Sequence, residues 1–185
     1  MEALTRADFD AGLDHVLASP LDVGTVELVV ARPGVGERVV LDQGELDPDS
    51  GLIGDSWVDR SSRHTPDGSP NPLMQLTLMN ARAVALVAGT EDRWPLAGDQ
   101  LYVDLELGDD NLPAGTQLEV GTAVVEITDQ PHTGCAKFAE RFGIEAARFV
   151  NSPVGREHNL RGVNARVIRG GVVRAGDRVR KVTDV

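Results

Sequence analysis

Residues 100–128 read QLYVDLELGDDNLPAGTQLEVGTAVVEIT, and this stretch decides the fold class. Its runs rich in Val, Leu and Ile lie at 100–107, 116–120 and 123–128. The residues that separate the runs include Pro113, Gly115 and Gly121. Short apolar runs with turn residues between them are typical of β-strands joined by tight turns. This stretch therefore predicts a β-rich fold.

The pattern extends toward the N-terminus. Residues 25–30 and 37–41 are strand-like, and the Pro and Gly residues between them predict a hairpin. Ahead of this hairpin, Thr5 and Asp8 have the spacing of a capping box, and apolar residues follow at helical spacing until a proline ends the run. We therefore predict one short amphipathic helix within residues 1–20.

Residues 42–72 have a different composition. They are rich in Asp, Gly, Ser and Pro, include Trp57 and His64, and show no sustained apolar period, so we predict a long loop. Because structureless loops longer than about 12–15 residues are uncommon in compact domains unless they are functional or disordered, we expect this loop to overhang a site. A strand is predicted at 73–78 and a short helix at 81–89.

The last third of the chain contains further short elements. Apolar residues between Phe138 and Val150 predict one or two short helices, and residues 165–168 form another strand-like run. The pair Gly170-Gly171 is predicted to join this run to Val172-Val173 as a two-residue hairpin.

These elements predict a mostly β fold with a few short helices. We expect a closed or partly closed β-barrel, because closure removes the exposed strand edges that promote aggregation, and a β-sandwich is the alternative. The length of 185 residues suits one core, so we expect a single domain over residues 1–185. In this domain the barrel occupies about residues 23–182, after the helix within residues 1–20.

The charge of the chain is unevenly distributed. A formal net charge of -11 argues against a nucleic-acid-binding protein, because phosphates would be repelled by most of the surface. Residues 131–185, however, carry 11 basic and 5 acidic side chains. These cations are either a solvated face of the sheet or part of a site for a small anionic ligand, and the sequence leaves both open.

Targeting signals are absent from the sequence. The first twenty residues lack the basic start and apolar run of a signal peptide, and no apolar run approaches the ~20 residues needed to cross a bilayer. With one cysteine, the chain forms no internal disulfide. We therefore expect a reduced thiol, a cytoplasmic location and no membrane contact.

Cys135 is the side chain best suited to chemistry. It closely follows the strand-like run at 123–128, so we expect its sulfur at the junction of a strand and a loop. The nearby cations Lys137 and Arg141 favour the thiolate, which is the nucleophilic and metal-binding form. His132 is a candidate base for the thiol. The competing interpretation is that Cys135 is a small apolar residue of the core.

Other chemistry is not indicated. His132 and Cys135 have the spacing of two zinc ligands, but no second pair completes the four ligands of a structural zinc site. The sequence has no Walker loop and no dinucleotide fingerprint. It also lacks the Gly-x-Ser-x-Gly motif of serine hydrolases. Zinc binding, nucleotide hydrolysis and serine hydrolase activity are therefore not expected.

Five short motifs follow one another along the chain. They are Gly54-Asp55, Gly98-Asp99-Gln100-Leu101, LPAGTQLEVG at 112–121, Cys135-Ala136-Lys137-Phe138 and GVVRAGDRV at 171–179. This ordered set around a single cysteine resembles the MOSC domain, a module named for the C-terminal part of the eukaryotic molybdenum cofactor sulfurase. The resemblance covers about residues 23–182.

The resemblance carries expectations about fold and function. It implies a barrel akin to the barrel domain of pyruvate kinase, and a link to the molybdenum cofactor (molybdopterin) or to sulfur transfer. In relatives, the cysteine to which Cys135 corresponds is proposed to carry sulfur as a persulfide or to ligate molybdenum. The chain would then be a sulfurtransferase or a component of a molybdenum-cofactor-dependent oxidoreductase. It would work with a cysteine desulfurase or a molybdoenzyme as partner.

The resemblance also assigns roles to residues. Cys135 is nucleophile or metal ligand, and His132 is its base or orienter. The remaining candidates for cofactor binding are Asp55, Asp99, Gln100, Thr133, Gly134, Lys137, Arg141 and Arg161. Asp99-Gln100 stands where relatives more often have Glu-Asn, and His132-Thr133-Gly134 where they often have basic residues and proline.

Two further expectations complete this interpretation. No pyridoxal phosphate site is expected, because this sequence lacks the aminotransferase-like domain that holds that cofactor in sulfurases. The alternative function is a non-catalytic binding module. Such a module would hold a pterin-type or other anionic ligand, or dock onto a sulfurase or molybdoenzyme.

Overall fold

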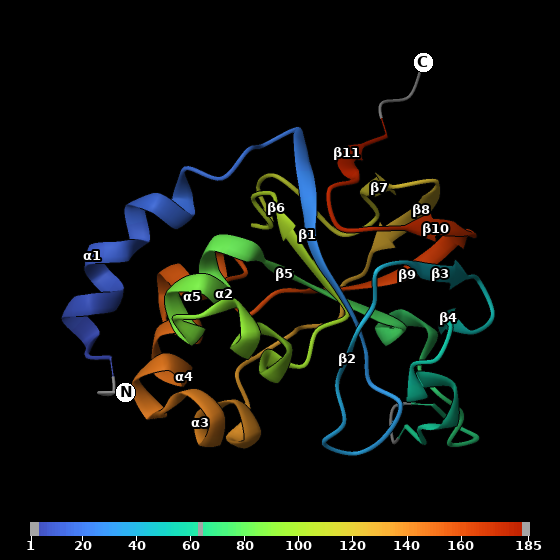
Figure 1. Cartoon of the computed structure of the whole chain (residues 1–185), viewed down its shortest axis with the longest axis horizontal. Helices are drawn as coiled ribbons and strands as arrows, with labels where there is room; N and C mark the ends of the chain where they lie inside the picture. Colours follow the sequence, from blue (N-terminus) through green and yellow to red (C-terminus); the bar gives the residue numbers. More distant parts are fainter. Residues whose placement is uncertain (1–3, 63–64, 183–185) are drawn as a thin grey trace.

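A computed structural model of the chain describes residues 4–62 and 65–182, and within these residues seven strands close into a β-barrel (Figure 1). Around the barrel they are β1 (Val23–Ala31), β6 (Leu101–Asp104), β5 (Leu76–Asn80), β9 (Val163–Arg169), β8 (Ala123–Ile127), β7 (Gln117–Val120) and β11 (Arg178–Lys181). Strands β5 and β6 are parallel, and the other neighbours are antiparallel. The pairing of β1 with β11 closes the barrel, so the predicted mostly β barrel is confirmed.

Alternation along the strands makes two cores. On β6, the side chains of Leu101 and Val103 point into the barrel, and Tyr102 between them points outward. Strand β1 follows the same rule, with a bulge between Val26 and Leu28 that changes the register against β6. The barrel interior is therefore filled by Val, Leu, Ile and Ala side chains.

The outer core lies between the barrel and a layer of helices. Figure 1 shows the helices gathered on one side of the barrel. They are α1 (Arg6–Leu17), α2 (Ala81–Ala88), α3 (Ala136–Phe142), α4 (Ile144–Val150) and α5 (Pro153–Glu157). Helix α1 begins with the predicted capping box of Thr5 and Asp8, and its Phe9 ring stacks on Phe149 of α4 at 4.8 Å. In the described part of the chain, no helix is long and apolar enough for a membrane crossing.

The prediction of a structureless loop at 42–72 is wrong. The segment forms short elements: β3 (Gly44–Asp47), β4 (Gly51–Leu52) and the 3₁₀ turns η1 (Ser56–Asp59) and η2 (Pro72–Met74). Leu46 and Leu52 are buried in the barrel core. Elements of two to four residues do not produce a measurable period in the sequence, which explains the error. His64 lies outside the described residues.

The predicted hairpin at Gly170-Gly171 is also wrong. Strand β10 (Gly171–Val173) pairs with β3 rather than with β9, and so forms a second sheet in the order β10-β3-β4. A side chain at position 171 would meet the backbone of Thr122 and Ala123 at 2.6 Å. The two glycines therefore serve a close crossing between sheets, not a turn between paired strands.

The remaining predictions need smaller changes. The hairpin of β1 with β2 (Val39–Val40) is confirmed, and α2 ends at Gly89 as predicted. The strand predicted at 73–78 is divided between η2 and β5. The one or two short helices predicted between Phe138 and Val150 are confirmed as α3 and α4, and α5 follows them as a helix that was not predicted. A 3₁₀ segment that the sequence did not reveal, η3 (Glu91–Ala97), leads into β6.

Candidate functional site

Cys135 is exposed and lines a cavity of about 600 Å³. It precedes the first residue of α3 and does not follow directly on β8, so the predicted junction of strand and loop is instead a junction of loop and helix. The cavity falls in the size range of small-molecule sites. The alternative that Cys135 is a small apolar residue of the core is therefore wrong.

The cavity around Cys135 is strongly cationic. Its walls come from the β1–β2 hairpin, from η1, from the end of η3 and from α3. The basic side chains among the lining residues are Arg32, Arg38, Arg60, Lys137 and Arg141, and the acidic one is Asp59. Lys137 and Arg141, predicted from the sequence, thus share the cavity with the thiol. We call this set of five basic side chains the cation cluster.

Successive backbone carbonyls hold the arginines in place. Pro95 O accepts from Arg38 Nε at 3.0 Å, Leu96 O from Arg141 Nη1 at 2.6 Å, Ala97 O from Arg161 Nη2 at 2.9 Å and Gly98 O from Arg32 Nη1 at 2.8 Å. The carbonyls at the end of a helical segment lack partners within it, and here guanidinium groups satisfy them. This backbone segment therefore gathers arginines that are far apart in the sequence.

Asp55 lies behind the cation cluster and not in the cavity lining. Its carboxylate is fully buried and accepts from Arg32 Nε at 2.8 Å, Arg32 Nη2 at 3.1 Å and the Arg32 backbone N–H at 2.9 Å. The same carboxylate accepts from the Trp57 backbone N–H at 2.9 Å. Asp55, predicted as a pocket group, therefore fixes the position of Arg32.

The members of the cation cluster repel one another. Burial lowers the pKa of Arg38, and the charges of Arg141 and Arg32 lower it further. Burial also lowers the pKa of Arg60, with a contribution from the charge of Arg32. An anion in the cavity would relieve this repulsion, so the electrostatics favour a negatively charged ligand.

A second set of predicted residues forms a buried network. Asp99 is fully buried and accepts from Arg161 Nη1 at 2.7 Å, and its other oxygen lies 2.9 Å from His132 Nε2. Burial opposes ionisation of Asp99, but Arg161 and His132 outweigh it and the pKa of Asp99 is lowered. The pKa of His132 is also lowered, by burial first and then by the charge of Arg161. His132 is therefore neutral near pH 7, with Nε2–H donating to Asp99.

This network lies beside the cation cluster but does not line its cavity. The guanidinium of Arg161 lies 4.9 Å from the ring of Phe138, which does line the cavity. His132 lines a different cavity. The predicted residues Asp99, His132 and Arg161 are thus brought together with each other, next to the wall of the site.

The other predicted residues have separate places. Gln100 is buried and accepts from the Thr77 backbone N–H at 2.8 Å and its hydroxyl at 2.7 Å, so it ties β5 to the start of β6. Thr133 is exposed. Gly134 exchanges two hydrogen bonds with the side chain of Asn151, at 3.0 and 2.9 Å, and this pair holds the loop before Cys135.

No group of three or more His, Cys, Asp or Glu residues in the described part of the chain is arranged to hold a metal ion. A metal at Cys135 would therefore need most of its ligands from a cofactor.

Sequence reasoning missed much of the cation cluster. The N-terminal third of the sequence has a negative net charge, which hides the basic residues Arg32, Arg38 and Arg60. They carry no shared motif, because folding brings them together. The carbonyls of Gly98 and Pro95 hold Arg32 and Arg38, and Ser56 Oγ holds Arg60. The predicted overhang of the 42–72 segment, however, was a usable signal, since Ser56, Asp59 and Arg60 line the cavity.

The fold is similar to several solved structures. The YuaD protein from Bacillus subtilis gives a TM-score of 0.62 at 17% identity, covering 85% of this chain and 94% of that chain. The YiiM protein from Escherichia coli gives 0.55 at 21% identity, covering 87% and 71%. YiiM from Geobacillus stearothermophilus gives 0.52 at 14% identity, covering 89% and 75%. At such identities the likeness establishes the fold.

Sequence comparison identifies the family. No curated protein matches the chain. Residues 73–180, more than half of its length, match the MOSC domain, and this span contains Cys135 and the carbonyls that hold the arginines. The chain therefore belongs to the MOSC domain family.

Proposed function

We propose that Cys135 is a sulfur carrier that works inside an anion-binding cavity. The observation that carries the proposal is an exposed thiol on the wall of a cavity whose basic side chains repel one another. Membership in the MOSC family supports the same chemistry. Thiolates attack sulfane sulfur, and the cavity gives the thiol access to a visiting donor.

The loading step is a thiol exchange. The thiolate of Cys135 attacks the outer sulfur of an organic persulfide, a new S–S bond forms, and the S–S bond of the donor breaks. The donor leaves as a thiolate, so the step needs neither an oxidant nor a reductant. The guanidinium groups of Arg38 and Arg141 stabilise the anions on either side of this exchange. A cysteine desulfurase that carries a persulfide is the proposed donor.

His132 acts in this proposal through position and not as a base for the thiol. Its Nε2 is committed to Asp99, and its ring lines another cavity. Together with Arg161, which also binds the carbonyl of Ala97, it supports the backbone from which the cation cluster is held. No proton is routed through His132.

The test is sulfur loading of the intact chain. Purified protein is incubated with a cysteine desulfurase and cysteine, and its mass is measured without reductant. We expect a gain of one sulfur atom that a reductant removes and that Cys135→Ser abolishes. Unchanged mass of the folded wild-type protein would refute the carrier function.

A second candidate is that the same cavity holds the molybdenum cofactor. The donor set fits: a thiol is a soft ligand that suits molybdenum, and the cation cluster suits a phosphate-bearing pterin. Cys135 would ligate the metal, and Arg38, Lys137 and Arg141 would hold the phosphate. When bound, the cofactor supplies two-electron redox chemistry.

Metal content decides between the two candidates. Protein purified from cells with intact cofactor synthesis is analysed for molybdenum, with Cys135→Ser as the matched variant. Molybdenum that depends on Cys135, without sulfur loading, would favour the cofactor. If the protein neither loads sulfur nor contains molybdenum, the chain would instead be a binding module for an anionic ligand.

A further inference from the structure

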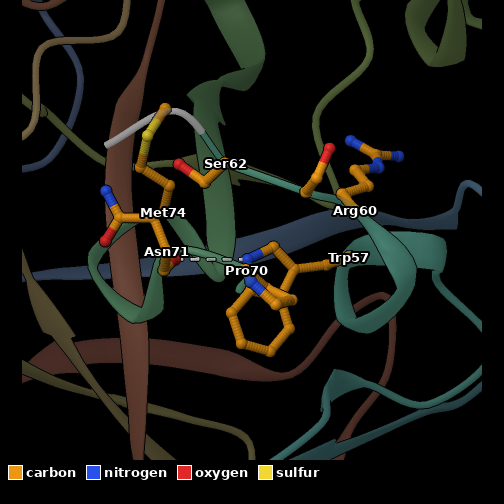
Figure 2. A pocket seen from close by; sticks show the side chains of 7 residues that line it. Trp57, Arg60, Ser62, Pro70, Asn71 and Met74 are labelled. Carbon is orange, nitrogen blue, oxygen red and sulfur yellow. Dashed lines mark hydrogen bonds between the residues drawn. The ribbon is translucent and has the colours of Figure 1, made fainter. Parts of the chain in front are cut away.

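A second cavity adjoins the cation cluster. It has a volume of about 480 Å³ and is lined by residues of η1, η2 and the chain between them (Figure 2). Figure 2 shows the Trp57 ring on one side of this cavity and Met74 on another, with Pro70 close to the ring. Apolar side chains therefore form much of the wall, and we call this space the tryptophan pocket.

The wall of the tryptophan pocket is fixed in position. Trp57 is 8% exposed, and its indole Nε1 donates to Asn71 O at 3.3 Å, the bond drawn in Figure 2. Its backbone N–H donates to Asp55, and its backbone carbonyl accepts from Arg60 N at 3.0 Å. An immobilised aromatic ring at the edge of a cavity is a surface on which a flat or apolar group can stack at little entropic cost.

Two residues join this pocket to the cation cluster. Arg60 lines both cavities, so they meet across one side chain. Asp55 binds Arg32 of the cation cluster through one carboxylate oxygen at 2.8 Å and the backbone of Trp57 through the other at 2.9 Å. The positions of the anion-binding groups and of the apolar wall are thus fixed relative to each other by one buried carboxylate.

We propose that the two cavities form one bipartite site for a small organic anion. The anionic group lies among the arginines next to Cys135, and an apolar body, flat enough to stack, lies on Trp57 and Met74. This inference deepens the proposed function, on which it rests, because it defines the class of molecule that is presented to the thiol. An inorganic anion would fill half of the site.

The experiment uses the intact chain and three probes. Naphthalene-1-sulfonate has both parts of the proposed ligand, sulfate has the anion alone, and naphthalene-1-sulfonamide has the ring without the charge. The chain contains two tryptophans, so a Trp94→Phe background makes Trp57 the reporter for fluorescence titration. We expect naphthalene-1-sulfonate to bind at least about tenfold more tightly than either of the other probes.

Variants separate the two halves of the site. Arg38→Gln should weaken both naphthalene-1-sulfonate and sulfate. Met74→Ser should weaken naphthalene-1-sulfonate to near the level of sulfate and leave sulfate unchanged, while the neighbouring Leu73→Ser is the matched control. Equal affinity for naphthalene-1-sulfonate and sulfate in the Trp94→Phe protein would overturn the bipartite site, and that comparison does not depend on whether Met74→Ser folds.

Sulfur loading keeps the two proposals distinguishable. Loading of Cys135 from inorganic polysulfide measures the carrier function with a donor that has no apolar body, so it is independent of probe binding in the tryptophan pocket. Tight binding of naphthalene-1-sulfonate without loading would refute the carrier function and keep the bipartite site. Normal loading without tight binding of that probe would refute the bipartite site and keep the carrier function.

Discussion

At the scale of single residues, the chemistry of His132 depends on what surrounds it. The sequence alone, with a histidine three residues before a cysteine, predicts that His132 acts as a base for the Cys135 thiol. In the fold its Nε2 faces Asp99, and burial together with Arg161 lowers its pKa. The imidazole is thus a neutral hydrogen-bond donor in a buried network, which has a consequence for stability.

Stability should depend on His132 below about pH 6.5. The unfolded chain binds a proton at His132 near its ordinary pKa of about 6.5, but the folded chain resists that proton, so the free energy of unfolding falls as the pH drops. Asp99 adds to this loss only at much lower pH, because its pKa is lowered. Urea denaturation between pH 7.5 and 5 should give a smaller slope for His132→Gln than for wild type. The exposed His15→Gln should match wild type, and equal slopes for all three would contradict the assignment.

Prediction from sequence succeeded for residues whose neighbours are local. Cys135, Lys137 and Arg141 lie within seven residues and share one cavity, as their spacing on a short helix allows. Asp55 instead supports Arg32 from behind the cavity, and Gln100 ties β5 to the start of β6, because burial depends on how strands pair across the barrel. No local pattern reports that pairing.

At the scale of elements, the end of η3 organises the site. The carbonyls at and just after this end accept from guanidinium groups on the β1–β2 connection and on α3. Strand and helix predictions identified α2 and β6 on either side, but not the 3₁₀ segment between them. Short 3₁₀ segments have weak sequence signals, so the element that positions the arginines could not be found before the structure.

The cation cluster should make Cys135 prefer anionic reagents. Iodoacetate is attracted by the arginines and iodoacetamide is not, so the ratio of their alkylation rates at the single thiol measures the local potential. Arg38→Gln should lower this ratio about threefold or more at low salt, and added salt should reduce the wild-type ratio. Arg178→Gln removes the same charge from an exposed position of β11 and should leave the ratio unchanged. An equal drop in both variants would indicate that net charge alone is responsible.

Gly98 should be required at the end of η3. Its φ is +94°, and a Cβ there would lie 3.3 Å from Arg38 Nη2. Gly98→Ala should cost roughly 1–2 kcal/mol of stability from the backbone and also lower the iodoacetate ratio, because Arg38 must move. Gly115 has a φ of +92° and open space where a Cβ would lie. Gly115→Ala should therefore lose stability without a change in the iodoacetate ratio. Thermal unfolding and alkylation rates of the two variants measure both effects.

At the scale of the whole molecule, the barrel brings together the segments that build the cavity. Arg32 follows the end of β1, Gly98 precedes β6, and Cys135 follows the loop after β8. Strands β1 and β6 are neighbours in the barrel, whereas β8 lies across the barrel from them. The loop that follows β8 brings Cys135 to the cavity that Arg32 and Gly98 also line. The sequence predicted closure from many short strands, but not the order β11-β7-β8-β9-β5-β6-β1 that sets which loops meet.

Closure itself depends on a close approach at Gly24. This residue of β1 pairs with Val179 of β11, and a Cβ on it would lie 1.9 Å from the backbone oxygen of Asp104 on β6. Gly24→Ala must therefore push β1 away from β6 at the point where β1 also holds β11. Overpacking of this kind costs about 1–3 kcal/mol, and we expect a loss of that size in urea denaturation.

The part of the barrel that Gly24→Ala destabilises is a sharper test of closure than the size of the destabilisation. Amide hydrogen exchange should speed up in Gly24→Ala at Val179 and its neighbours on β11, which β1 holds in the barrel, and much less in the helical layer at Val84. Thr25→Ala, an exposed change one residue along the same strand, should alter neither stability nor exchange by a comparable amount. Faster exchange spread evenly over the chain would mean that the barrel does not open at the β1–β11 pairing.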